Sequence, residues 1–257
     1  MLRLSLQRRR RLMPWIFLGP GLAWLIVFFA IPLVNQLNVS LQTGDPETGY
    51  VFNWAFSTYT DAISDYSEQF LRSIGYAATA TVLCFVIAFP LAYFIAFKAG
   101  RYKNLMLLLI ILPFFVSYVL RTVSWQLILA DDGFVVDTLK TIGLVGDDGR
   151  LLATRTAVIA GITYNFLPFM ALPLALPGIF AGSLLTFIPA CGDFINAALL
   201  GTPQQFMIGN VIQSKFLNIL DYPTAAALSF TLMLFILVGI FIYARLLGTR
   251  NLTEAAI

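Results

Sequence analysis

Histidine is absent from this 257-residue chain, and charged residues make up only 11% of it. The lack of histidine removes the usual general base and the commonest metal ligand. A soluble domain carries roughly 25% charged residues, so this chain has too few to cover a surface that faces water. No G-x-x-x-x-G-K-[ST] phosphate-binding loop occurs either. These absences argue against a soluble enzyme and against an ATPase of the P-loop type.

Cysteine is also scarce, with only Cys84 and Cys191, and each lies within an apolar run. Such a position favours two small buried thiols, and nothing in the sequence supports a disulfide or a catalytic thiol. We therefore expect no catalytic residue, no metal site and no nucleic-acid partner.

Long apolar runs are what the chain does have, and 59% of its residues are hydrophobic. A membrane-spanning helix needs about 20 predominantly apolar residues, and runs of that kind recur along the whole length. The sequence predicts an all-α, polytopic membrane protein of about six transmembrane helices that form a single domain. The expected spans are 12–37, 72–97, 104–129, 154–172, 175–199 and 224–247. The apolar stretch that begins at Leu12 is too long for a secretory signal, so we expect it to be a retained first helix.

The charged residues separate by side once these spans are drawn. Acidic residues fall almost entirely in the segments after the first, third and fifth spans. Basic residues cluster in the segments that the positive-inside rule assigns to the cytoplasm, namely Arg3, Arg8, Arg9, Arg10, Arg11, Lys98, Arg101, Lys103, Arg245 and Arg250. The pattern predicts a protein of the cell membrane with both termini in the cytoplasm.

No charged residue lies between Arg155 and Asp193, so this stretch could be drawn as one long span or as two. A single span would place Arg245 and Arg250 outside, whereas two spans keep them in the cytoplasm. The break is expected near Pro168, Pro173 and Pro177, because proline interrupts a helix. Two helices joined there would lack a polar connecting segment.

Apart from basic residues at the span ends, two charged residues lie inside the expected spans, where such groups are costly and often functional. Arg121 lies in the third span and Asp193 near the end of the fifth. We hypothesise that they face a shared cavity, with Asp193 available to a cation and Arg121 fixing the local geometry. The alternative is that Arg121 extends to the outer interface and that Asp193 only caps a helix end.

Four further residues are secondary candidates for a substrate pathway: Tyr118, Trp125, Tyr164 and Asn165. Aromatic rings attract ammonium groups by cation–π interaction. Aromatic residues at helix ends are also common at both membrane interfaces, and that interpretation stays open.

Several stretches are typical of one family of membrane proteins. They are LPFFVSY at 112–118 with Arg121-Thr122 and Trp125, YNFLPFM at 164–170, LPGIFAGS at 176–183 continuing to Phe194, LGTP at 200–203, MIGN at 207–210, DYP at 221–223 and AALS at 226–229. On these residues the chain from Arg72 onward resembles the permease subunits of binding-protein-dependent ABC importers, specifically the spermidine/putrescine type.

The resemblance implies a type I ABC importer permease fold and a set of partners. These would be a second permease subunit, ATP-binding subunits that hold the ATP, and an extracytoplasmic solute-binding protein. Membrane lipid would surround the permease. It implies no cofactor on this chain itself.

One element of that family has no counterpart here. Family members carry a coupling loop with a Glu-Ala-Ala signature between the fourth and fifth spans, where this chain reads LPFMALPLALPG at 167–178. The Glu-Ala-Ala at 254–256 is at the C-terminus and is treated as chance. The loop expected near Pro173 is either omitted from this sequence, truly deleted, or replaced by another means of coupling. No ATPase-coupling residue is assigned.

The sequence thus predicts a membrane-spanning permease that translocates polyamines with energy from a separate ATPase subunit. Two alternatives stay open at this point. One is an inactive or uncoupled permease variant that lacks the coupling loop. The other is an ion-coupled secondary carrier, although that mechanism needs intramembrane acids on several helices and this chain offers essentially one.

Overall fold

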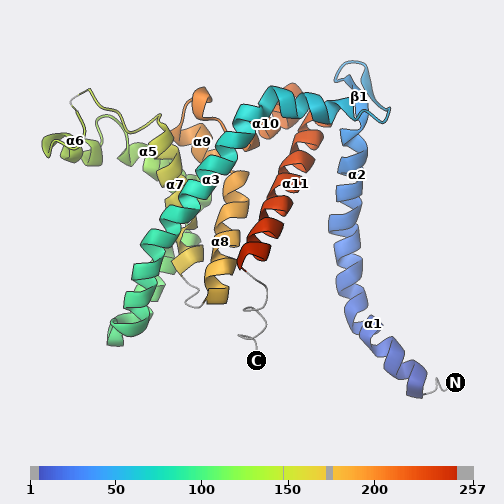
Figure 1. Cartoon of the computed structure of the whole chain (residues 1–257), viewed down its shortest axis with the longest axis horizontal. Helices are drawn as coiled ribbons and strands as arrows, with labels where there is room; N and C mark the ends of the chain where they lie inside the picture. Colours follow the sequence, from blue (N-terminus) through green and yellow to red (C-terminus); the bar gives the residue numbers. More distant parts are fainter. Residues whose placement is uncertain (1–5, 147, 172–175, 248–257) are drawn as a thin grey trace.

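The computed structural model describes residues 6–146, 148–171 and 176–247, and its architecture is all-α apart from one small hairpin (Figure 1). Helices suit the apolar sequence, because a helix in lipid satisfies its backbone polar groups within one segment. The helices and strands are α1 (Leu6–Leu25), α2 (Ile31–Ser40), β1 (Gln42–Asp45), β2 (Gly49–Phe52), α3 (Ser57–Phe97), α4 (Lys103–Ile111), α5 (Tyr118–Ile128), α6 (Phe134–Thr141), α7 (Arg155–Ala171), α8 (Leu176–Cys191), α9 (Ile195–Leu200), α10 (Ile208–Ser214) and α11 (Tyr222–Leu247).

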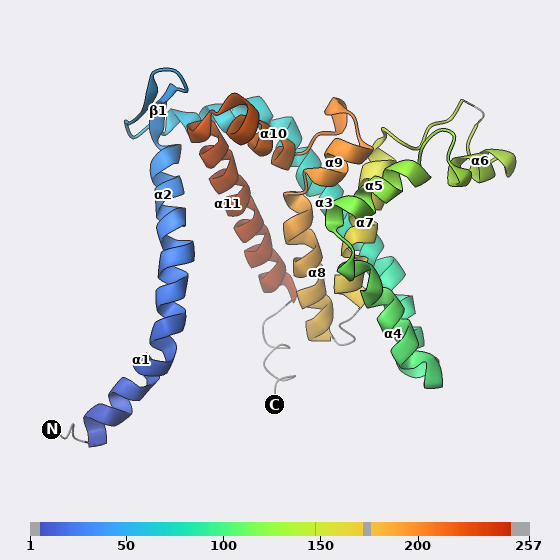
Figure 2. The same ribbon diagram turned by 180° about the vertical axis from the view of Figure 1, so that it is seen from behind.

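The N-terminal helical segment consists of α1 and α2, joined by a π-helical turn at Ile26–Ala30. It includes the expected first span, 12–37, and its apolar stretch from Met13 to Ser40 is long enough to cross a membrane. Figures 1 and 2 both show this segment apart from the other helices over most of its length. It meets α11 near the β1–β2 hairpin, which follows it directly.

The long helix α3 forms one wall of the core. It begins at Ser57, well before the expected span 72–97, and bends at Tyr66. Its buried face carries small residues at intervals of three or four positions, Ala77, Ala80, Cys84 and Ala88, none of which is exposed. Small side chains let helices approach closely in a membrane, and α7 packs along this face.

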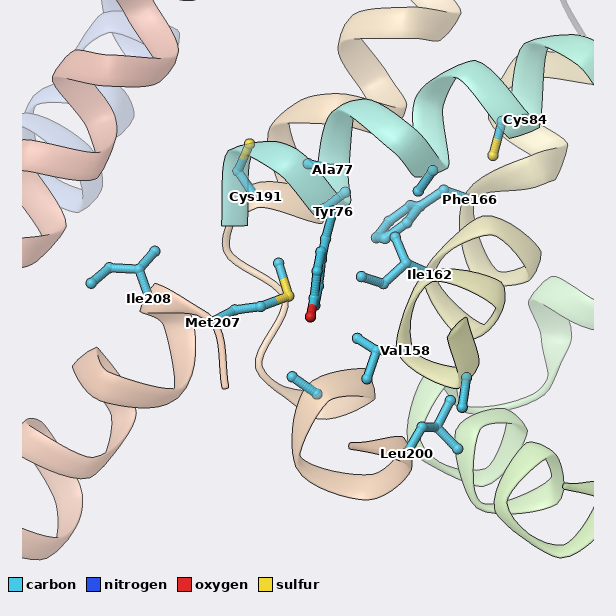
Figure 3. Packing of buried hydrophobic residues seen from close by; sticks show 14 of the residues in the cluster. Tyr76, Ala77, Cys84, Val158, Ile162, Phe166, Cys191, Leu200, Met207 and Ile208 are labelled. Carbon is cyan, nitrogen blue, oxygen red and sulfur yellow. The ribbon is translucent and has the colours of Figure 1, made fainter. Parts of the chain in front are cut away.

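Apolar side chains from α3, α7 and α9 meet in this core (Figure 3). Val158, Ile162 and Phe166 come from α7, and Leu200 comes from α9. Cys84 and Cys191 are buried free thiols, and Cys84 Sγ donates to the carbonyl oxygen of Thr163 at 3.3 Å. Both thiols therefore act as small packing residues.

The charge-free stretch between Arg155 and Asp193 folds as two helices rather than one. α7 ends at Ala171, α8 begins at Leu176, and the two helices pack against each other. The coupling loop expected near Pro173 falls at residues 172–175, which lie outside the described residues.

Within the expected span 104–129 the chain bends by 98° between Gly100–Phe115 and Tyr118–Ile128, so the span is not one straight helix. α4 leads into a 3₁₀ turn at Leu112–Phe115, and Val116 and Ser117 then adopt extended ψ angles of 139° and 138° before α5 begins. Pro113 lies in the 3₁₀ turn, and proline cannot donate a backbone hydrogen bond to an α-helical ladder. The bend leaves backbone polar groups at Val116–Ser117 outside a regular helix.

The expected span 175–199 is also interrupted. Residues 192–194 separate α8 from the short helix α9. The Asp193 carboxylate accepts the first backbone N–H groups of α9, which starts a new helix instead of continuing the old one. Irregular backbone at membrane depth is tolerated only where it is buried in protein or lines a cavity. Both breaks therefore indicate a region where a functional site is expected.

Within the described residues, three helical segments are long and apolar enough to cross a membrane, or four if the bent α4–α5 pair is one span. These are Met13–Ser40, Ser57–Phe97 and Tyr222–Arg245. α7 and α8 have 17 and 16 residues, which is short for a full crossing. The number of six spans thus stays a prediction.

The two ends of the molecule differ in what they contain. The start of α1, the turn between α3 and α4, and the end of α11 lie at one end (Figure 1). The β1–β2 hairpin, α6 and α9 lie at the other end (Figure 2). This arrangement places the basic segment of 98–103 opposite the acidic residues that precede α6.

An ion pair at the hairpin end fixes the start of α11. Lys215 Nζ donates to Asp221 Oδ2 at 3.0 Å, and the backbone N–H of Thr224 donates to Asp221 Oδ1 at 3.3 Å. Burial acts to raise the pKa of Asp221, but the hydrogen bonds from Lys215 and Thr224 outweigh it and hold the pKa below its ordinary value. Asp221 is consequently a carboxylate at neutral pH.

Asp221→Asn is expected to lower the free energy of unfolding by about 1 kcal/mol at pH 7, because Lys215 loses a charged partner. Since the folded pKa of Asp221 is depressed, its contribution is present above the unfolded pKa of about 3.9 and is lost as the pH falls below that value. Thermal melting of the detergent-solubilised protein between pH 7 and pH 3 measures both effects. The exposed Asp61→Asn serves as the control, and equal pH profiles for the two variants would contradict the prediction.

Candidate functional site

The two helix breaks bring one group of polar side chains together in the otherwise apolar body. Tyr118 and Thr122 come from the first turns of α5, Asn165 from α7, Asp193 from the α8–α9 break and Asn196 from α9. We call these five residues the polar cluster. Thr122, Asn165, Asp193 and Asn196 are all buried.

Asp193 has hydrogen-bond donors on both carboxylate oxygens. Its Oδ1 accepts the backbone N–H groups of Ile195 and Asn196, at 2.9 and 3.0 Å. Its Oδ2 accepts the Tyr118 hydroxyl at 2.5 Å and the Asn196 side-chain amide at 2.6 Å. The carboxylate therefore caps α9 and also ties α9 to α5.

The rest of the cluster joins α7 to the same point. The Asn165 side-chain amide Nδ2 lies 3.2 Å from Thr122 Oγ1 and 3.3 Å from Asn196 Oδ1. Asn165 Oδ1 is buried and has no hydrogen-bond partner among the described residues. A buried acceptor without a donor costs roughly 1–3 kcal/mol, so this oxygen is available to a donor from outside the cluster.

Arg121 lies beside the cluster but is not part of its hydrogen bonding. Its side chain is buried, and the guanidinium carbon is 5.1 Å from the centre of the Phe114 ring and 5.7 Å from that of Tyr118. No ion pair joins Arg121 to Asp193 in the part of the chain that the structure describes. Instead Tyr118 contacts the guanidinium through its ring and the carboxylate through its hydroxyl.

A cavity of about 410 Å³ lies at the α4–α5 bend, next to the polar cluster. It is lined by Leu112, Pro113, Val116, Arg121, Ser124, Trp125, Ile128 and Tyr164. The rings of Trp125 and Tyr164 are 5.4 Å apart at an angle of 60°. We call this space the Arg121 cavity.

The six residues singled out from the sequence thus divide into two sets of three. Arg121, Trp125 and Tyr164 line the Arg121 cavity, whereas Tyr118, Asn165 and Asp193 belong to the polar cluster. Asp193 is not among the residues that line the Arg121 cavity, and a cavity shared by Arg121 and Asp193 stays a prediction. The Tyr118 ring lies between the two charged groups.

Sequence reasoning missed Thr122 and Asn196. Both carried a weak signal, since Thr122 follows Tyr118 by four positions and so shares its helix face. Asn196 follows Asp193 by three positions, the spacing at which an N-cap residue and the first turn interact. Neither residue is ionisable, so the cost of burying a charge does not single them out.

α10 supports the α8–α9 break from the hairpin end of the molecule. The Asn210 side-chain amide donates to the carbonyl oxygen of Phe194 at 2.8 Å, and Asn210 Oδ1 accepts the backbone N–H of Met207 at 3.0 Å. A Cβ atom at Gly209 would lie 2.4 Å from the carbonyl oxygen of Gly192, so only glycine fits there. This close contact fixes the backbone that carries Asp193.

The chemistry of the site is binding rather than bond-breaking. The polar cluster offers carbonyl, hydroxyl and carboxylate oxygens, and the adjoining cavity offers a cation and two aromatic rings. Among the described residues, no three His, Cys, Asp or Glu side chains gather in a way that could hold a metal ion. Ordered polar groups at broken helices are a common arrangement in membrane transporters.

Comparison of the fold places the chain in a class of membrane protein. Its structure matches that of a bacterial ABC transporter that imports the acidic polysaccharide alginate, with a TM-score of 0.64 and 20% identity over 97% of this chain and 99% of the other. The same TM-score is found for a bacterial alginate ABC transporter in complex with its periplasmic protein bound to an alginate pentasaccharide. The fold is therefore that of an ABC transporter permease.

Sequence comparison identifies the family. The chain is 31% identical to the spermidine/putrescine transport system permease protein PotB of Haemophilus influenzae, over 87% of this chain and 90% of the relative. It is 30% identical to PotB of Escherichia coli K12, over 86% of this chain and 93% of the relative. No protein-family model matches the chain. The chain belongs to the family of spermidine/putrescine-type ABC transporter permeases.

The length of these matches bears on the missing loop. The match with the Escherichia coli protein extends over 256 residues but takes in only 86% of this 257-residue chain. The relative therefore has residues within the matched region that have no counterpart here.

Proposed function

We propose that this chain is a membrane-spanning permease subunit that takes up polyamines such as spermidine and putrescine. The observation that carries the proposal is the sequence identity of about 30% with two polyamine permeases over nearly their whole length. The chain forms one permease domain in this proposal, and its membrane helices surround the route that the solute follows.

The energy comes from other subunits in this proposal. The sequence contains no P-loop, so ATP is bound and hydrolysed by separate ATP-binding subunits and no cofactor is needed on this chain. A second permease subunit completes the pathway, and an extracytoplasmic binding protein delivers the solute. The alginate transporter of similar fold works with a periplasmic protein, which supports that last partner by analogy of fold.

Both termini are cytoplasmic in this proposal. The basic residues of 98–103 lie at the same end of the molecule as the start of α1, and the acidic loop segments lie at the other end. The positive-inside rule assigns the basic end to the cytoplasm. The polar cluster then lies nearer the outer face, where an incoming solute would first meet it.

The polar cluster and the Arg121 cavity are our candidates for contact with the solute. A polyamine is an alkyl chain that carries several ammonium groups. Each ammonium group needs oxygen acceptors or aromatic faces around it. Asn165 Oδ1 is a buried acceptor with no donor in the part of the chain that the structure describes, and Tyr118, Trp125 and Tyr164 supply rings close by. Asp193 adds a carboxylate, but a cation can reach it only if Tyr118 or Asn196 moves aside.

An uncoupled permease variant is the alternative that remains to be tested, although the comparisons favour the importer permease. The stretch 167–178 lacks the Glu-Ala-Ala segment of the family, and the relatives have residues within the match that this chain lacks. If the loop is absent from the native protein, the ATP-binding subunit has lost its main docking element. An ion-coupled carrier is not favoured by the comparisons.

Uptake of radiolabelled spermidine by cells that express the chain with its partner subunits tests the main proposal. We expect uptake that needs the chain and that stops when the ATP-binding subunit is inactivated. Co-purification of the ATP-binding subunit with the chain separates the two candidates. Co-purification without spermidine uptake would argue against polyamines as the solute, and failure to co-purify would favour the uncoupled variant.

A further inference from the structure

The Arg121 cavity contains a cation that has no counter-charge among the described residues. Arg121 is 8% exposed, and its Nε and Nη1 atoms are buried without a hydrogen-bond partner among the described residues. A buried charge is costly unless it is paired and hydrogen-bonded. The rings of Phe114 and Tyr118 offset part of that cost but accept no directional hydrogen bond of ordinary strength.

No acidic side chain forms an ion pair with Arg121 among the described residues. Asp193 is the buried carboxylate of this region, and its two oxygens are already engaged by four donors. The three ion pairs in the described residues join other partners. The Arg121 Nε and Nη1 atoms are thus available to an acceptor on a bound molecule.

The cavity is rich in donors and poor in acceptors. Besides Arg121, its lining includes the Trp125 indole and the Tyr164 phenol, and neither side chain makes a polar contact within the ranges that the structure describes. The Ser124 hydroxyl is already used, since it donates to the carbonyl oxygen of Leu120 at 2.9 Å. This combination fits an oxyanion, because a guanidinium binds phosphate or carboxylate oxygens strongly.

The rest of the lining is apolar and partly exposed. Leu112, Val116 and Ile128 lie between 42% and 52% exposed at the edge of the cavity, and Leu109 and Leu127 extend the same apolar surface. A surface of this kind faces hydrocarbon in a membrane protein, and Trp and Tyr are the residues that prefer the depth of lipid headgroups. An occupant that enters from this side needs an oxyanion and an apolar tail.

We propose that the Arg121 cavity binds an anionic phospholipid. Its phosphate pairs with the Arg121 guanidinium, the Trp125 and Tyr164 donors face its headgroup, and an acyl chain lies along Leu112, Val116 and Ile128. An anionic headgroup is favoured over phosphatidylcholine, because the choline group adds a second cation beside Arg121. The site would hold the α4–α5 bend to the lipid and compensate the charge of Arg121, and the polar cluster alone would then be the candidate for contact with the solute.

Fluorescence quenching by brominated lipids tests this proposal on the full chain. Trp15, Trp24 and Trp54, each about 65% exposed, are replaced by phenylalanine so that Trp125 is the sole tryptophan. The protein is reconstituted in phosphatidylcholine vesicles that contain increasing amounts of brominated phosphatidylglycerol. We expect phosphatidylglycerol to quench Trp125 with an apparent preference of about tenfold over phosphatidylcholine, the effect of one charge-assisted contact.

Arg121→Gln in this background is expected to abolish the preference, and Arg121→Lys to retain part of it, since lysine keeps the charge but loses the planar fork. Arg155→Gln is the matched control, because Arg155 is exposed and lies over the Tyr76 ring at 6.0 Å outside the cavity. If Arg121→Gln does not fold, comparison of Arg121→Lys with the Arg155→Gln control still measures the preference for phosphatidylglycerol.

Two outcomes would overturn the proposal. Equal quenching in the parent and in Arg121→Gln would mean that Trp125 meets only bulk lipid. Relief of quenching by millimolar inorganic phosphate would assign the cavity to a free anion instead of a lipid. The measurement needs neither ATP nor polyamine, so its failure would leave the permease function untouched.

Discussion

Asp193→Ala is expected to lower the free energy of unfolding by about 4 kcal/mol, because it leaves several buried or half-buried donors without an acceptor. The donors are the backbone N–H groups of Ile195 and Asn196, the Tyr118 hydroxyl and the Asn196 amide. Asn196 is buried and Tyr118 and Ile195 are half-buried, so water has little access to these donors. Loss of the cap also frees α9 from α5, and thermal melting in detergent measures the total effect.

Asp193→Asn is the matched variant, and it is expected to cost only about 1 kcal/mol. Its side-chain oxygen can still accept the two backbone N–H groups at the start of α9. Its amide would face the Asn196 amide, but a rotated Asn196 can accept that proton. Asn165 can rotate in turn, because its Oδ1 has no hydrogen-bond partner to lose within the described ranges. A cost for Asn as large as that for Ala would contradict this account of the cluster.

The same pair of variants separates a structural role for Asp193 from a role in transport. If the carboxylate meets a cationic solute, Asp193→Asn loses spermidine uptake while it keeps most of its stability. Unchanged uptake in Asp193→Asn would remove Asp193 from the substrate pathway and leave it as the cap of α9. The experiment therefore decides between the two interpretations that the sequence left open.

The membrane character of the chain and the special position of Arg121 and Asp193 could be predicted from the sequence. Both follow from the free-energy cost of placing polar or charged groups in lipid. Few charged residues and long apolar runs indicate a polytopic helical protein. Arg121 and Asp193 stand out because ionisable groups are rare at such positions. Both are buried, and Tyr118 contacts Arg121 through its ring and Asp193 through its hydroxyl.

The division of the site into a polar cluster and a separate cavity could not be predicted. It depends on the ring of Tyr118, whose position is set by two helix breaks that no apolar pattern reveals. Pro113 does not identify the break at Val116–Ser117, since Pro90 and Pro168 lie within helices that continue. Whether a proline ends a membrane helix depends on which neighbours satisfy the freed backbone groups.

Gly209→Ala is expected to lower the free energy of unfolding by about 3 kcal/mol, because the added methyl group meets backbone rather than a movable side chain. Its Cβ would lie 2.4 Å from the carbonyl oxygen of Gly192 and 3.0 Å from the carbonyl carbon. Relief of that clash must move α10 or the α8–α9 break. Either movement disturbs the hydrogen bond from Asn210 to Phe194 and the backbone that positions Asp193.

Gly75→Ala is the control for this prediction, because a Cβ at exposed Gly75 in α3 would meet nothing within 4 Å. Replacing a helical glycine at such a position is expected to stabilise the protein by about 0.5 kcal/mol. The two alanine variants should therefore shift the melting temperature in opposite directions, and Gly209→Ala alone should reduce solute uptake. Equal melting temperatures would mean that α10 does not fix the break, and the position of Asp193 would then depend on its own hydrogen bonds alone.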